Sequence, residues 1–103
     1  MTPDLSPYDT ADYLDSDEAV EAYLDAALED GDPALITYAL GAVARARGMS
    51  NIARQAGLSR ESLYRALGPE GNPEFGTVMR VLKALGLRLT TVKLPAPADA
   101  GSP

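Results

Sequence analysis

A helix-turn-helix pattern occupies residues 49–67, which read Met-Ser-Asn-Ile-Ala-Arg-Gln-Ala-Gly-Leu-Ser-Arg-Glu-Ser-Leu-Tyr-Arg-Ala-Leu. Ala53 is the small side chain that two short helices need where they cross steeply, and Gly57 can adopt the left-handed backbone of the turn. The positions that we expect inside are Ile52, Ala56, Leu58, Leu63 and Ala66, and those that we expect outside are Arg60, Glu61, Tyr64 and Arg65. The outward set would enter a DNA major groove, although the same pattern also fits a purely structural helix pair.

The predicted second helix of this motif carries residues suited to reading bases. Ser59 would cap the helix and can bind a phosphate, Arg60 matches the two acceptors of guanine, and Glu61 can accept from cytosine. For Tyr64, a DNA contact and partial burial against Phe75 are both open. The expected DNA-binding residues are Arg47, Ser50, Asn51, Arg54, Ser59, Arg60, Glu61, Ser62, Tyr64 and Arg65. Those before the turn would contact phosphates, which position a protein without specifying a sequence.

The net charge of -6 is unevenly distributed along the chain. Residues 1–44 contain eleven acids and no Lys or Arg, whereas residues 45–93 contain all nine basic residues against three acids, a net charge of +6. This asymmetry suggests two different partners, one polyanionic and one cationic. The alternative is that the acidic surface only keeps a small protein soluble.

The composition argues against most kinds of catalytic and metal-binding site. The 103 residues include no cysteine and no histidine, which excludes disulfides, thiolate catalysis, imidazole bases and the usual zinc ligand sets. The carboxylates have the spacing of helix caps and solvated faces, so we expect neither an enzyme nor a metal or other cofactor. No apolar run approaches the roughly 20 residues of a membrane span, and the N-terminus does not resemble a signal peptide. We therefore expect a single cytoplasmic domain without membrane contact.

Two helices are predicted before the motif, after an extended acidic arm over residues 1–15. Asp15, followed three residues later by Glu18, would cap a helix over residues 16–30. Asp32 and the following proline would open a second helix that continues to Arg47.

Caps and turns delimit the rest of a helical domain over residues 16–86. Ser50 and Ser59 would cap the two helices of the motif. Asn72, before a proline, would begin a last helix that reaches Leu85, with Phe75 at its start covering the core.

Residues 87–94, Leu-Arg-Leu-Thr-Thr-Val-Lys-Leu, are the one strand candidate in the sequence. A lone strand has no partner inside this chain, so it would pair with a second copy or with another protein's sheet edge. The alternative is a frayed extension. The residues expected to mediate dimerisation are Leu87, Leu89, Thr91 and Val92. Residues 95–103 would form a disordered tail.

Several segments together resemble a known family over about residues 6–90. These segments are Ser6-Pro7-Tyr8-Asp9, Ala11-Asp12-Tyr13-Leu14, residues 23–32, residues 57–67, Gly71-Asn72-Pro73 and residues 82–87. The chain resembles the addiction-module antidote proteins, HigA-like antitoxins with an XRE/Cro-type DNA-binding domain. We therefore predict an all-α, five-helix, lambda-repressor-like domain with an acidic N-terminal arm and a short C-terminal β-strand.

The resemblance implies a cognate toxin of the RelE/ParE superfamily, small and basic, which the antitoxin neutralises while repressing the operon that both share. Because one helix-turn-helix makes few DNA contacts, we expect a homodimer on a palindromic operator. Charge complementarity suggests the acidic end of the chain as the toxin-binding surface. The residues expected there are Tyr8, Asp9, Asp12, Tyr13, Leu14, Asp17, Glu18, Glu21 and Asp25. The alternatives are a stand-alone XRE-type repressor and a protein-interaction module that does not bind DNA.

Overall fold

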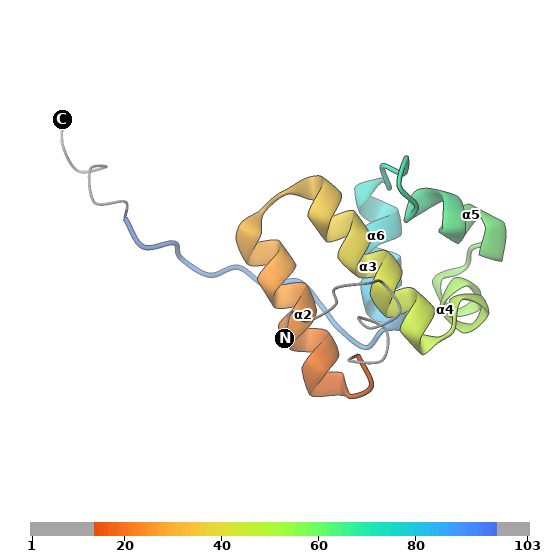
Figure 1. Cartoon of the computed structure of the whole chain (residues 1–103), viewed down its shortest axis with the longest axis horizontal. Coiled ribbons are helices and arrows are strands. Elements are labelled where there is room, and N and C mark those ends of the chain that lie inside the picture. Colours follow the sequence, from red (N-terminus) through yellow and green to blue (C-terminus); the bar gives the residue numbers. More distant parts are fainter. Residues whose placement is uncertain (1–13, 97–103) are drawn as a thin grey trace, which may run out of the picture.

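The computed structural model describes residues 14–96, in which five α-helices and no strand are present. Figure 1 shows the helices α2 to α6 around one core, with α2 at one end of the molecule and α4 and α5 at the other. The expected all-α architecture is thus confirmed for this part of the chain. The arm expected over residues 1–15 lies almost entirely outside the described residues, as do the last seven residues of the expected tail.

The first two helices form an antiparallel pair whose ends follow from their caps. Helix α2 spans Asp17–Asp30 and ends at Gly31, and helix α3 spans Pro33–Arg47, where the Asp32 carboxylate accepts a hydrogen bond from the Ala34 amide at 3.0 Å. The predicted cap of α2 was wrong by one residue. The Ser16 hydroxyl, and not Asp15, accepts from the Ala19 amide at 3.1 Å, because Ser16 lies directly before the first helical residue.

The motif helices are α4, Met49–Ala56, and α5, Arg60–Ala66. Gly57 between them has φ 75° and ψ 30°, the left-handed conformation that the sequence pattern required. Ser59 caps α5 as predicted. Ser50 is not a cap, because the chain turns at Gly48 and α4 already begins at Met49.

Helix α6 spans Phe75–Ala84 and packs against α4. It begins two residues later than predicted, since residues 71–74 remain a loop and Glu74 is the residue before the helix. The expectation for Phe75 was wrong: its side chain is 70% exposed and does not cover the core. Residues 87–96 form neither helix nor strand, although Leu87 and Leu89 pack partly buried against the core of their own chain.

The core joins all five helices through small and branched side chains. Leu14, Val20, Val43, Leu63 and Val81 are among its most completely buried members. Helices α2 and α3 pack together, and α4 contacts α3, α5 and α6. Helices α3 and α6 therefore pack against one side of the α4–α5 pair, and the other side of the pair is exposed.

Candidate nucleic-acid interface

The pair of helices α4 and α5 buries one side and exposes the other, largely as the sequence pattern predicted, although Leu58 and Ala66, both expected inside, are only partly buried. Ile52, Ala53, Ala56 and Leu63 are buried, while Arg60, Glu61, Tyr64 and Arg65 are all exposed. Ala53 lies within the α4 helix at 2% exposure, at the place where a larger side chain would separate the packed helices. The buried side fixes the geometry of the motif, and the exposed side remains available for a partner.

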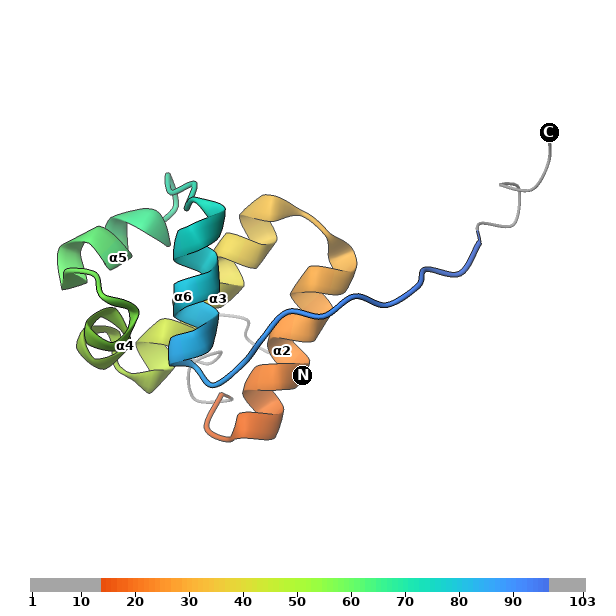
Figure 2. The same ribbon diagram turned by 180° about the vertical axis from the view of Figure 1, so that it is seen from behind.

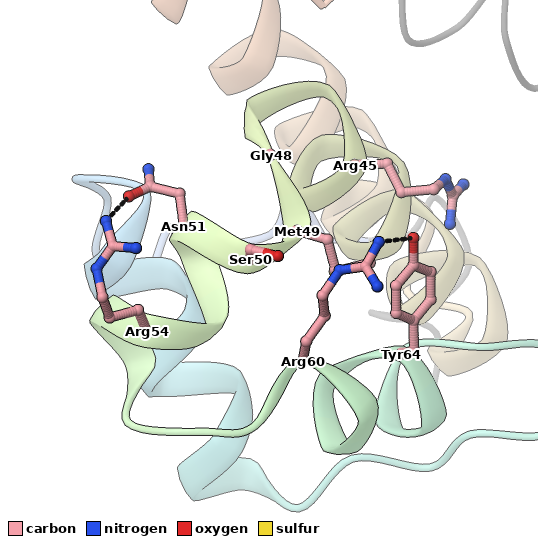
Figure 3. Close-up of a pocket in the computed structure, with 8 residues that line it drawn as sticks. All are labelled: Arg45, Gly48, Met49, Ser50, Asn51, Arg54, Arg60 and Tyr64. Carbon is pink, nitrogen blue, oxygen red and sulfur yellow. Dashed lines mark hydrogen bonds between the residues drawn. The ribbon is translucent and has the colours of Figure 1, made fainter.

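An open hollow of about 570 Å³ lies between the start of α4 and the exposed side of α5 (Figure 3). Its lining residues are Arg45, Gly48, Met49, Ser50, Asn51, Arg54, Arg60 and Tyr64. Three of these carry a guanidinium group and none carries a carboxylate. The hollow therefore has the positive charge that attracts a phosphate backbone.

Arg60 is held in place by the aromatic ring one turn along its helix. Its guanidinium carbon lies 4.9 Å from the centroid of the Tyr64 ring, and its Nη2 donates a hydrogen bond of 3.3 Å to the Tyr64 hydroxyl. The two side chains meet because residues four apart lie on the same face of a helix. Such a stack is worth about 0.5–1 kcal/mol at an exposed site and limits the positions that the guanidinium can take. Tyr64 therefore orders Arg60 on the exposed side instead of being buried against Phe75.

Asn51 organises the opposite wall of the hollow. Its Oδ1 accepts hydrogen bonds from Arg54 Nη2 at 2.7 Å and from Gln55 Nε2 at 3.1 Å. Both donors lie one turn further along α4. The Arg54 guanidinium is thus fixed at the edge of the hollow, with its other N–H groups directed away from Asn51.

The first turn of α4 has no side-chain cap, since Gly48 precedes the helix. Helix N-termini leave backbone N–H groups without an intrahelical partner, and these groups favour anions. In α5, by contrast, the Ser59 hydroxyl accepts from the Ser62 amide at 3.0 Å and donates to the Ser62 hydroxyl at 2.8 Å. The open helix start in the hollow is therefore that of α4, where Ser50 and Asn51 lie.

The structure brings together five of the ten residues predicted to bind DNA. Ser50, Asn51, Arg54, Arg60 and Tyr64 line the hollow. Four others, Ser59, Glu61, Ser62 and Arg65, belong to α5 or its cap but are not part of the lining.

Arg47 is engaged elsewhere. Its Nη2 lies 2.5 Å from Asp17 Oδ1, which ties the end of α3 to the start of α2. Sequence reasoning missed Arg45, the arginine of α3 that does line the hollow. The choice between the two arginines depends on the direction in which the chain leaves Gly48, whose φ is 97°, and only the folded structure gives that direction.

The residues expected to bind a toxin are only partly within the described structure. Tyr8, Asp9, Asp12 and Tyr13 lie outside the described residues. Leu14 is 1% exposed and belongs to the core, so it cannot offer a contact to a partner. Glu18, Glu21 and Asp25 are exposed on α2, and Asp17 is exposed but paired with Arg47.

Comparison with known proteins identifies the family. The model of a family described as "probable addiction module antidote protein" matches residues 4–93. A protein of Haemophilus influenzae (strain ATCC 51907 / DSM 11121 / KW20 / Rd), described as an uncharacterized protein, is 52% identical over 88 residues, which cover 85% of this chain and 91% of the relative. No solved structure matches. The family match spans all five helices, α4 and α5 included, and the chain therefore belongs to the probable addiction module antidote proteins.

Proposed function

We propose that the protein is the antitoxin of a type II toxin-antitoxin module and that it represses its own operon through the helix-turn-helix. Membership of the antidote family supports the antitoxin role. The observation that carries the DNA-binding role is the arginine-lined hollow, in which Arg45, Arg54 and Arg60 surround the uncapped start of α4. Within residues 14–96, none of the helices has the length and apolar composition of a membrane span.

In this proposal α4 and α5 contact different parts of the DNA. The start of α4, with Arg45 and Arg54, contacts the phosphate backbone and sets the position of the protein on the duplex. Helix α5 enters the major groove, where Arg60 reads a guanine and Arg65 a further base or a phosphate. A homodimer would present two such helices to the half-sites of a palindromic operator.

The toxin partner is proposed to be a basic protein of the RelE/ParE superfamily, similar to HigB. Support comes from the acidic surface of α2, where Glu18, Glu21 and Asp25 are exposed, and from the family membership. This surface and α5 lie at different ends of the molecule (Figure 1). In this arrangement one chain can hold a toxin and DNA at the same time.

Substituting Arg60 and Arg65 with alanine tests the DNA-binding role. Each bidentate contact to a base is worth about 1–3 kcal/mol, so we expect the double variant to lose at least tenfold in affinity for the DNA upstream of its gene in a gel-shift titration. Arg88→Ala removes one positive charge from the segment after α6, away from α5, and should leave the affinity within about twofold. Unchanged binding by the double variant would contradict the role of α5.

Charge reversal on α2 tests the toxin-binding surface separately. Glu18→Lys combined with Asp25→Lys should abolish rescue of cells that express the proposed toxin, because the new positive charges would repel a basic protein. Both side chains are exposed and neither contributes to the core, so the fold should be kept. Glu70→Lys, in the loop before α6, is a control that reverses one carboxylate away from α2, and it should rescue fully. Full rescue by the α2 variant would exclude this surface.

A further inference from the structure

An apolar groove lies away from the helix-turn-helix, between α2, α3 and the start of α6. Its volume is about 250 Å³, and its lining includes Leu24, Leu28, Ile36, Phe75, Val78 and Leu89. Phe75 is 70% exposed and Leu28 is 41% exposed, although both are large apolar side chains. A contiguous exposed apolar surface of this kind usually marks an interaction site.

Three exposed carboxylates belong to residues that lie next to groove-lining residues in the chain or on the same helix. Glu21 lies three residues before Leu24 on the same helix, so the two side chains are neighbours on the α2 surface. Asp32 directly precedes Pro33, and Glu74 directly precedes Phe75. All three carboxylates are exposed, and no lysine or arginine lines the groove. A segment that complements this groove would place apolar side chains in the groove and a basic side chain near the carboxylates.

The segment after α6 has this chemistry. Val92 and Leu94 are 79% and 78% exposed. In an extended backbone, side chains two residues apart share one side, and Lys93 between them would lie on the other. Leu89 of the same segment already lines the groove. Figure 2 shows the segment after α6 passing α2 and then leaving the body of the molecule. Val92 and Leu94 of this copy are not among the residues that line the groove.

We infer that the groove binds Val92 and Leu94 of a second copy of this chain, and that the second copy's groove receives the same residues in return. Lys93 would then lie near these three carboxylates. The exchange is symmetric about a two-fold axis, as expected for a homodimer. In this exchange Val92 and Leu94 of the second copy would extend the apolar surface of the groove that Leu89 already lines.

The sequence around Thr90 argues against the chain filling its own groove. A reversal after Leu89 would have to be made by Thr90 and Thr91, two β-branched residues that favour extended backbone and lack the features of turn residues. Side-by-side pairing of two 87–94 segments, the dimer expected from the sequence alone, would leave the groove and Phe75 open. The exchanged arrangement covers both.

Cysteine cross-linking distinguishes these arrangements, since the chain has no cysteine of its own. Leu28→Cys and Val92→Cys chains, one carrying a tag that changes its length, are purified, mixed and mildly oxidised. The exchange predicts a disulfide-linked heterodimer on a non-reducing gel. Val92→Cys mixed with Glu61→Cys, whose cysteine lies on α5, should give none. If the Leu28→Cys and Val92→Cys double variant forms only an internal disulfide, or if the mixed chains do not cross-link, the inference is wrong.

Light scattering on variants of both surfaces tests the same contact without cysteines. Leu28→Glu in the groove and Val92→Asp in the segment should each lower the mass in solution from two chains to one chain of 10.8 kDa. Ala26→Glu, exposed elsewhere on α2, and Thr91→Asp add the same charges and should remain dimers. Circular dichroism verifies that each variant is folded.

A wild-type monomer, or a Leu28→Glu dimer, would overturn the exchange. The inference rests on the homodimer of the proposed function. These measurements contain neither DNA nor toxin, so their failure would leave the DNA-binding and toxin-binding proposals to their own tests.

Discussion

Gly41 and Gly76 both lie in helices, but a methyl group added at each would meet different surroundings. Gly41 lies in the middle of α3, where a Cβ atom would come 2.9 Å from the backbone oxygen of Leu67, so α3 and the end of α5 touch without an intervening side chain. Gly76, in the first turn of α6, has no atom within 4 Å of its Cβ position. The same substitution therefore meets a rigid backbone at one position and open space at the other.

Gly41→Ala and Gly76→Ala should change stability in opposite directions. We expect Gly41→Ala to lower the free energy of unfolding by about 1–3 kcal/mol, because the Leu67 carbonyl must shift. Gly76→Ala should raise it by about 0.5–1 kcal/mol through the higher helix propensity of alanine. Urea unfolding followed by circular dichroism measures both, and a stabilising Gly41→Ala would contradict the close contact.

Tyr23, partly buried on α2, links stability to alkaline pH. Burial raises the pKa of its hydroxyl, nearby Tyr38 raises it further, and Arg45 lowers it. The folded chain therefore holds the phenolic proton more tightly than the unfolded chain does, and the free energy of unfolding falls as the pH rises above 10. We expect Tyr23→Phe to lose less stability than the wild type between pH 9 and pH 11 in urea titrations. Equal losses would show that Tyr23 does not contribute.

At the scale of single elements, the start of α2 distinguishes two adjacent polar residues. Ser16→Ala removes the hydroxyl that accepts from the Ala19 amide and should cost about 1 kcal/mol of stability. Asp15→Ala removes no cap hydrogen bond and should cost at most a few tenths of that value. Thermal unfolding of the two variants measures the difference, and the reverse order would restore Asp15 as the cap.

The ends of the helices could be predicted wherever one residue determines the backbone. Gly31 and Gly57 end α2 and α4 with a left-handed conformation, and Pro33 begins α3. The starts of α4 and α6 could not be predicted, because several polar residues compete to cap a helix and tertiary packing selects among them. The exposed faces of α4 and α5 were predictable from helical periodicity, whereas the contribution of Arg45 depends on the turn at Gly48.

The C-terminal segment shows a further limit of the sequence pattern. Alternation of apolar residues over 87–94 predicted a strand, yet in this chain Leu87 and Leu89 pack against the helices and no ladder partner is present within residues 14–96. A pattern of apolar residues indicates that their side chains will be buried, but it does not identify the residues that they pack against. Here the first two are covered by the core, and Val92 and Leu94 remain exposed.

For the whole molecule, the distribution of charge is compatible with the proposed DNA-binding role, although the net charge is -6. Acidic α2 lies at one end of the molecule and the motif helices α4 and α5 lie at the other (Figure 1), and the hollow beside α4 and α5 is lined by Arg45, Arg54 and Arg60. At an ionic strength of 0.15 M, interactions between exposed charges are largely screened beyond about 8 Å, so carboxylates farther than this from the hollow have little effect on a phosphate bound there. Not all basic residues serve this surface, because Arg88 and Lys93 belong to the segment that passes α2.

The most direct test is the affinity of the full-length protein for the DNA upstream of its gene, compared with a scrambled duplex of equal composition, across a series of salt concentrations. We predict at least a thousandfold preference for the upstream DNA near physiological salt, and an affinity that falls as salt rises. Arg54→Ala should reduce the slope of log affinity against log salt by about 1, because one phosphate contact is lost. Equal affinity for the two duplexes would contradict a sequence-reading helix-turn-helix.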